Sequence, residues 1–197
     1  MINIEQYDYP LKQKHIIRAA EGLFRRYGYK RVPVEEICRE AGVSKMTFYK
    51  YYGNKSQLVK FLWNLWFEQG LKKFDEIMTR DIPFTEKLRL MLKLKEESIN
   101  EISRSLARDY FNAAPELEIF FKEMQKKHIE RMLRFIREEQ EKGNVRPDMR
   151  PEFFLAVVNK LSELLKDEKL INQYEHYSDF VMEINNFLFY GISNKNN

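Results

Sequence analysis

Residues that could do chemistry gather behind a glycine in the first third of the chain. Gly42 can take the left-handed conformation of a tight turn, and Ser44 can cap a following helix by accepting from N–H groups of its first turn. The exposed face of that helix would carry Ser44, Lys45, Met46, Thr47, Tyr49 and Lys50. Hydroxyl and ammonium groups in such a row can reach phosphates and base edges. The pattern therefore predicts a surface that binds nucleic acid.

The elements that must position this surface are indicated by the flanking residues. Pro33 suits a first helical position because its φ is fixed and it has no N–H. One buried face of a preceding helix is indicated by the spacing of Val34, Ile37, Cys38 and Ala41. In the second helix, Phe48 and Tyr52 are placed to face inward. A short helix, a glycine turn and a second helix form a helix-turn-helix, which lays its second helix in the DNA major groove.

Charge is distributed unevenly along the chain. Residues 1–60 contain 12 Lys and Arg against 6 Asp and Glu, an excess of +6, whereas the remaining residues contain 22 against 24. The net charge of +4 therefore originates in the first third. This distribution favours a polyanionic partner for that part, bound with an affinity that falls steeply as salt rises. For any single basic residue, a solvated helix face is the alternative interpretation.

Composition predicts an all-α protein. The 197 residues are 44% hydrophobic, which suffices for one large or two small domains. Only 7 Gly and 6 Pro are present, and the longer segments lack the alternating pattern of strands. No apolar run is long enough to span a membrane, and the polar segment 1–6 lacks the features of a signal peptide. We therefore expect a cytoplasmic protein with no membrane partner.

Catalytic and metal motifs are not evident. The sequence contains no glycine-rich phosphate loop, nucleophile elbow or paired-histidine metal motif that rises above chance. We therefore predict no catalytic residue, no metal site and no cofactor, and an enzyme is the least favoured alternative. Cys38, the single cysteine, cannot form an internal disulfide and is expected to be a small buried hydrophobe.

From about Gln13 to Leu62 the sequence resembles the DNA-binding domain of the TetR family of bacterial transcriptional regulators. The family pattern is met at Ile37, Ala41, Gly42, Val43, Ser44, Tyr49, Tyr51, Lys55 and Leu58, with Tyr52 in place of the usual Phe. The first helix of the family is matched by Ile16, Ile17, Ala19, Ala20, Leu23, Phe24 and the ending Tyr27-Gly28-Tyr29. The chain departs from the family at Pro33, where many members carry Thr, and at Met46, where they carry a small residue.

Beyond this motif, apolar stripes and helix-ending residues predict further helices, about nine in all. Helices are expected to begin near Asn54, Pro83, Pro115, Pro151 and Asn172. The first of these should continue to about Met78, and Gly143 should end the long helix that begins at Pro115. We expect a three-helix DNA-binding domain over residues 1–55 and a C-terminal helical ligand-binding and dimerisation domain over residues 56–197.

The resemblance implies a homodimeric repressor that binds double-stranded DNA at a palindromic operator and is released by a small hydrophobic effector. Val34 and Lys55 would join the exposed residues of the second helix in contacting DNA, with Lys45 and Thr47 nearest the bases and Tyr49 and Lys55 on phosphates. The effector would bind among central-helix residues and pull on the fourth helix; the candidates are Trp66, Phe67, Met91, Tyr110, Phe111, Phe120 and Met124. The last two long helices would form the dimer through Phe154, Val158, Leu165, Val181 and Leu188.

Alternatives remain for these sets. The aromatic and methionine side chains of the central helices, and the apolar side chains of the last two helices, could simply fill the core of one chain. The main alternative to a regulator is a helical interaction protein of the same fold without operator binding. Such a protein should carry acidic residues in the second helix of the motif or lack its basic ones, whereas Lys45, Lys50 and Lys55 are all present.

Overall fold

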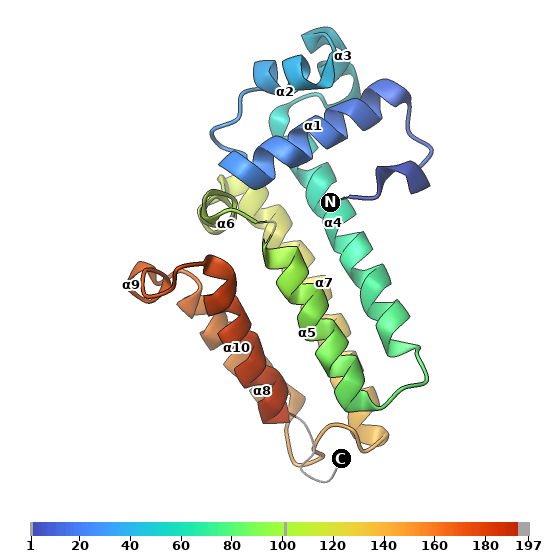
Figure 1. Ribbon diagram of the computed structural model, residues 1–197, viewed down its shortest axis with the longest axis vertical. Helices are drawn as coiled ribbons and strands as arrows, with labels where there is room; N and C mark the ends of the chain where they lie inside the picture. Colours follow the sequence, from blue (N-terminus) through green and yellow to red (C-terminus); the bar gives the residue numbers. More distant parts are fainter. Residues whose placement is uncertain (1, 101, 193–197) are drawn as a thin grey trace. The chain divides into compact units, whose positions relative to one another are not determined.

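The computed structural model describes residues 2–100 and 102–192, and within these ranges every regular element is helical (Figure 1). A short 3-10 helix, η1 (Ile4–Gln6), precedes ten α-helices among the described residues. They are α1 (Leu11–Tyr27), α2 (Val34–Ala41), α3 (Lys45–Tyr52), α4 (Lys55–Met78), α5 (Phe84–Asn100), α6 (Arg104–Phe111), α7 (Pro115–Glu141), α8 (Pro151–Leu164), α9 (Glu168–Ile171) and α10 (Tyr177–Ile192). The predicted all-α fold is confirmed.

Local chemistry sets many of the helix ends, as the sequence predicted. The Asn54 side chain accepts from the N–H of Gln57 at 2.9 Å and caps α4. Pro115 and Pro151 are the first residues of their helices. Gly143, with φ +76°, lies just beyond the end of α7 in a conformation that favours glycine.

Two predicted helix starts were wrong. Pro33 lies just before α2 with extended backbone dihedrals, so Val34 is the first helical residue. The last helix begins at Tyr177 rather than near Asn172, because the chain turns between α9 and α10. In that turn the N–H of Tyr174 donates to the carbonyl of Ile171 at 3.2 Å.

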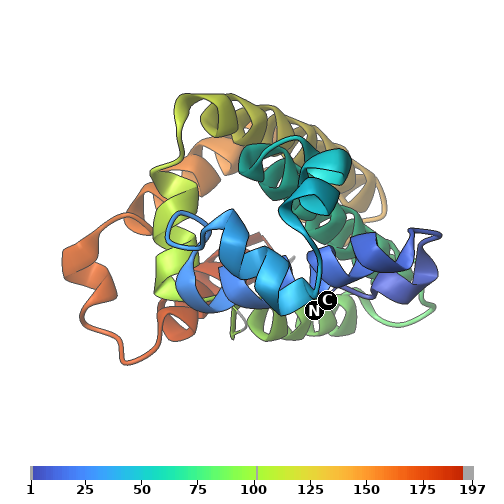
Figure 2. The ribbon, with the colours of Figure 1, turned by 90° about the horizontal axis from the view of Figure 1, so that it is seen from above.

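The chain forms two compact units. The first comprises Met1–Glu76 and Glu101–Glu118, and therefore extends beyond the predicted domain 1–55 to include most of α4 and all of α6. Its helix α1 packs against α2, α3 and α6 (Figures 1 and 2). Fully buried side chains from α1 to α4 form its core, namely Ile16, Ile17, Phe24, Ile37, Phe48, Leu58, Val59 and Leu62. This core holds α2 and α3 in place.

The second unit comprises Ile77–Asn100 and Ile119–Asn197. Helices α5 and α10 pack side by side in it (Figure 1). Its apolar core is contributed by α5, α7, α8 and the turn between the last two, and consists of Phe84, Leu88, Ile136, Val145, Met149 and Phe154. The turn is held by the buried Glu139 carboxylate, which accepts from the Asn144 side chain at 2.7 Å, and by Gln140, whose amide donates to the Met149 carbonyl at 2.7 Å.

Candidate nucleic-acid interface

The corner between α2 and α3 has the geometry that the sequence predicted. Gly42 is left-handed, with φ +63° and ψ +35°. The N–H of Val43 donates to the carbonyl of Cys38 at 3.0 Å and closes the end of α2. The Ser44 hydroxyl oxygen accepts from the N–H of Thr47 at 3.1 Å, and the two hydroxyls lie 3.0 Å apart. Three residues therefore separate the end of α2 from the start of a new helix.

Helix α3, which we call the reading helix, separates its buried and exposed side chains as predicted. Phe48 is fully buried and Tyr52 is 6% exposed, and their ring centroids lie 5.9 Å apart on the buried face of the helix. Most of the other predicted residues are exposed, and they are Ser44, Lys45, Met46, Tyr49 and Lys50. Thr47 and the Val34 side chain of α2 are partly buried. The structure thus brings these predicted residues onto one corner of the first unit.

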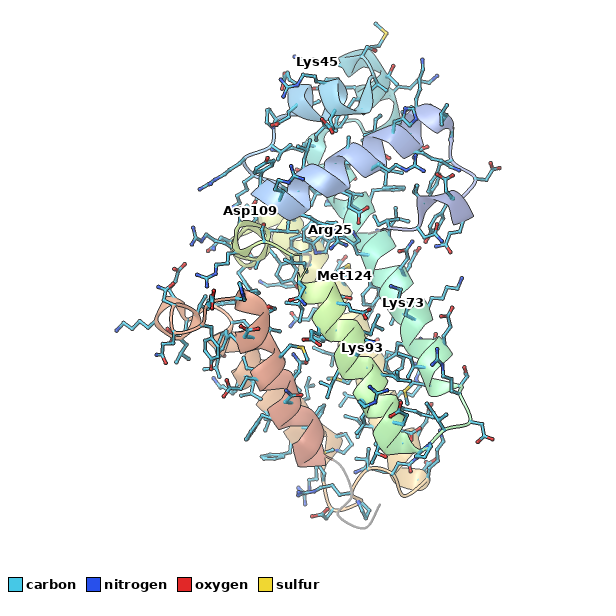
Figure 3. All side chains as sticks on the ribbon, viewed as in Figure 1. Arg25, Lys45, Lys73, Lys93, Asp109 and Met124 are labelled. Carbon is cyan, nitrogen blue, oxygen red and sulfur yellow. The ribbon has the colours of Figure 1, made fainter. Side chains whose placement is uncertain are left out.

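An ion pair ties the reading helix to α2. The Lys45 Nζ lies 2.5 Å from a Glu35 carboxylate oxygen, and both side chains are exposed. The hydrogen bond from Lys45 lowers the pKa of Glu35, and the same bond raises the pKa of Lys45. Figure 3 shows Lys45 on the side of α2 and α3 that faces away from α1. The sequence prediction missed Glu35, because its relation to Lys45 depends on how two helices pack.

Lys55 is engaged by the backbone of its own unit. Its Nζ donates to the carbonyls of Tyr29, Lys30 and Val32 at 3.0, 3.3 and 3.0 Å. Burial lowers the pKa of this ammonium, and the negative charge of Asp109 partly opposes that effect. An ammonium has three donors, so these three carbonyls use all of them. We call this arrangement the Lys55 clasp; it closes the turn between α1 and α2 in the structure.

Helix α6 docks on the same turn. The Asp109 carboxylate accepts from the N–H of Lys30 at 2.8 Å, and the Tyr29 hydroxyl donates to the Asp109 carbonyl at 3.1 Å. A Cβ on Gly28 would lie 2.5 Å from the Asp109 carboxylate, so this approach requires a glycine. Figure 3 labels Asp109 on α6 beside the end of α1. Asp109 was not among the predicted site residues, since it lies about eighty positions from its partners in sequence.

The seven predicted effector residues are all partly buried, and they divide between the two units. Trp66, Phe67, Tyr110 and Phe111 belong to the first unit, whereas Met91, Phe120 and Met124 belong to the second.

In the first unit, Trp66 and Tyr110 illustrate the partners of these side chains. The Trp66 indole N–H donates to the buried Glu21 carboxylate at 3.0 Å, and Tyr110 stacks on Trp63 with their planes 4° apart. In the second unit, Met91 packs against the apolar core. Packing within the core explains these contacts at least as well as contact with a ligand would.

The predicted dimer residues lie deeper than expected. Phe154 and Val181 are 7% and 6% exposed, so their side chains fill the second unit and offer little surface to a partner. Val158 and Leu188 pack against the same core, and Leu165 is partly buried just after α8. Among the side chains of α8 and α10 that the structure describes, the large exposed apolar ones are instead Phe153 and Phe187, at 65% and 69% exposure.

Cys38 is buried on α2, as predicted. Within the described part of the chain, no group of three or more His, Cys, Asp or Glu side chains is arranged to hold a metal ion. None of the helices described is both long enough and apolar enough to cross a membrane.

Comparison with known proteins agrees with this geometry. The sequence family model for bacterial regulatory proteins of the tetR family matches residues 16–61. These residues cover most of α1, all of α2 and α3, and the start of α4. Residues 16–61 of the chain therefore match the TetR family.

Two regulators of Bacillus subtilis resemble the N-terminal part of this chain. The uncharacterized HTH-type transcriptional regulator YhgD is 31% identical over 75 residues, which are 38% of this chain and 39% of YhgD. The uncharacterized HTH-type transcriptional regulator YuxN is 35% identical over 75 residues, which are 38% of this chain and 26% of YuxN. The matched segment thus spans well under half of either relative.

Solved structures share the fold over nearly the whole chain. The fatty acid degradation regulator FadR from Bacillus halodurans has a TM-score of 0.71 at 20% identity, covering 92% of this chain and 96% of that one. FadR from Bacillus subtilis, in complex with stearoyl-CoA, has a TM-score of 0.69 at 19% identity, covering 91% and 99%. SmeT, the repressor of the Stenotrophomonas maltophilia efflux pump SmeDEF, has a TM-score of 0.66 at 16% identity, covering 94% of both chains.

Proposed function

We propose that this TetR-family chain is a transcriptional regulator that binds double-stranded DNA as a homodimer and releases it when a hydrophobic effector binds. The observation that carries the proposal is the reading helix, which two buried aromatic side chains anchor while Lys45, Met46, Tyr49 and Lys50 remain exposed. The +6 excess of residues 1–60 supports a polyanionic partner for this corner. A helical interaction protein without operator binding should carry acidic residues here or lack the basic ones, whereas Lys45 and Lys50 are present and exposed.

Individual roles follow from the contacts of each side chain. Lys45 and Thr47 lie in the first turn of the reading helix, the part that meets base edges in helix-turn-helix proteins. Val34 would lie close to the DNA backbone. Tyr49 and Lys50 are exposed further along and are suited to phosphates. We assign Lys55 a positioning role, because its three donors already hold the turn between α1 and α2.

The effector is proposed to be a molecule with a long apolar part. Support comes from the partly buried aromatic and methionine side chains of the central helices, and from the stearoyl-CoA in the structure of Bacillus subtilis FadR. Helix α6 offers a route to the DNA-binding corner in addition to the predicted route through α4. It follows α5 and precedes α7 in the chain, and its Asp109 bonds the turn that Lys55 also holds. An effector that favours one position of α6 would thereby bias the position of the reading helix.

The homodimer is proposed to form through α8 and α10. Phe153 and Phe187 are exposed on these helices and would be covered by a second copy. Two-fold symmetry would then present two reading helices to the half-sites of a palindromic operator, one DNA turn apart.

Fluorescence anisotropy with duplexes from the region upstream of the chain's own gene tests the proposal. The logarithm of the affinity should fall linearly with the logarithm of the salt concentration, and Lys50→Gln should flatten the slope by about 1. Lys160→Gln, which removes an exposed positive charge of α8, is the matched control and should leave the slope unchanged. Stearoyl-CoA added to the same assay should reduce binding. Failure to bind these duplexes or random ones at low salt contradicts the proposal.

A further inference from the structure

Met46 combines an apolar side chain with an exposure that is unusual for its type. It is 83% exposed, the highest value among the large exposed hydrophobic residues of the described chain. Single exposed apolar residues are common on protein surfaces and require no special explanation. Met46 differs because it is the second residue of the reading helix, on the corner proposed to enter the major groove.

The neighbours of Met46 are already occupied by contacts inside the chain. The hydroxyls of Ser44 and Thr47 bond to each other, and Ser44 also caps the helix. The Lys45 ammonium is paired with Glu35 across the corner. In the first turn of the reading helix, Met46 therefore offers the long side chain that can contact DNA without first giving up an internal polar contact.

The chemistry of the thioether restricts which base edge this side chain can favour. Its sulfur is at most a weak acceptor, and the rest of the side chain is apolar and flexible. Most major-groove edges present donors and acceptors, which would lose water without gaining a partner if methionine covered them. Thymine is the base that presents an apolar group there, the 5-methyl group. Contact with that methyl group would remove two apolar surfaces from water at once.

We propose that Met46 is a specificity-determining residue that selects thymine in each operator half-site by contact with the thymine 5-methyl group. The inference rests on the proposed function, since it requires the reading helix to lie in the major groove. Many TetR-family members carry a small residue at this position. In this chain, Met46 would instead help to determine which operator sequence is recognised.

Replacement of thymine by deoxyuridine isolates this contact, because it removes the methyl group and keeps base pairing. A duplex is first selected from a random-sequence pool with the purified full chain, and each thymine is then replaced in turn. We expect one position per half-site at which the replacement weakens binding by about fourfold, the effect of one methyl-sized apolar contact. Replacement in both half-sites together should weaken binding by about sixteenfold.

Protein variants then assign the effect to one side chain. Met46→Ala should bind the thymine and deoxyuridine duplexes equally, whereas Met46→Leu and Lys45→Ala should still discriminate between them. Because Met46 is so exposed, Met46→Ala should unfold at the same temperature as the parent chain.

The outcomes separate this inference from the proposed function. If no duplex is enriched from the pool, DNA recognition itself fails and the inference falls with it. If a duplex is enriched but every deoxyuridine replacement is neutral, the inference alone is overturned. It is also overturned if the methyl effect persists undiminished in Met46→Ala, because another residue then makes the contact.

Discussion

At the scale of single residues, Lys55 illustrates how one ammonium group has to be assigned between the fold and a ligand. The family resemblance places it on a phosphate, whereas in the structure its three donors bond to three carbonyls of the turn between α1 and α2. A phosphate could compete only by displacing at least one carbonyl, which would leave that acceptor unpaired in a partly buried place. The clasp and the phosphate contact therefore predict different behaviour when Lys55 is removed.

Lys55→Met should lower the free energy of unfolding by about 1–3 kcal/mol, because the carbonyls lose charged hydrogen bonds. DNA affinity should also fall, since the turn supports α2, but the salt dependence of binding should keep its slope. Thermal denaturation and anisotropy titrations across salt concentrations measure the two effects. Lys50→Gln is the matched comparison, and it should change the slope and leave the unfolding temperature unchanged. A Lys55→Met protein of unchanged stability with a slope flattened by about 1 would show that the phosphate contact is correct.

Residue roles were predictable where they depend on near neighbours in sequence. The left-handed Gly42, the capping Ser44 and the buried Phe48 all follow from local backbone chemistry and helical spacing. Glu35 and the clasp of Lys55 were not predictable in this way, because their partners are supplied by helix packing. The sequence predicted that Lys45 is exposed, but not that its ammonium group is paired with Glu35.

At the scale of elements, α6 links the first unit together across a long stretch of sequence. Besides the Asp109 contacts, the N–H of Ser103 just before α6 donates to the carbonyl of Arg25 in α1 at 3.1 Å. Gly28 allows this close approach, and its φ of +79° with ψ of +155° is a conformation essentially restricted to glycine. The turn between α1 and α2 is thus held from two sides, by α6 and by the Lys55 clasp.

Asp109→Ala should loosen this turn without disturbing the reading helix directly. The Lys30 N–H loses its acceptor, so we expect faster hydrogen exchange across residues 28–32 and a loss of stability of about 1 kcal/mol. Hydrogen-exchange mass spectrometry and thermal denaturation provide the measurements. Asp148→Ala, which removes an exposed carboxylate paired with Arg146, is the control and should leave exchange over residues 28–32 unchanged. Unaltered exchange there in Asp109→Ala would mean that α6 does not hold the turn.

Helix boundaries were predictable where a cap, proline or glycine marks them, as at Asn54, Pro115 and Gly143. The start of α10 was not, and Tyr174 explains the error. Its ring packs 5.0 Å from that of Phe180, and its hydroxyl donates to the Glu183 carboxylate at 2.7 Å. Tyr174 therefore folds back onto α10 from the preceding turn and continues the apolar stripe without being helical. Spacing alone cannot distinguish that arrangement from one more helical turn.

At the scale of the whole molecule, composition predicted the all-α class but not the division into units. The first unit joins a segment ending at Glu76 to one ending at Glu118, and only long-range contacts such as those of Asp109 define it. The same dependence on long-range packing explains why predicted dimer residues lie in the core. Helical spacing correctly marked an apolar face on α8 and α10, but Phe154 and Val181 on that face are used by the core. Among the described side chains of these helices, Phe153 and Phe187 are the large apolar ones exposed to a partner.

If Phe153 and Phe187 form the contact between two copies, replacing both with Ser should produce a monomer. Four phenylalanine rings would be covered in a symmetric pair, and burial of each contributes about 1.5–3 kcal/mol, so dimerisation should weaken by two orders of magnitude or more. Both side chains are exposed in the single chain, so the unfolding temperature of the monomer should change little. Sedimentation velocity across protein concentrations measures the association directly.

Ile119→Ser, which makes a similar polar replacement at a 61% exposed residue of α7, should remain dimeric. The operator supplies a second readout, because a monomer presents one reading helix and should bind a half-site and the full palindrome with similar affinity. A double variant that remains a dimer at low micromolar concentration would place the contact between copies elsewhere on the molecule.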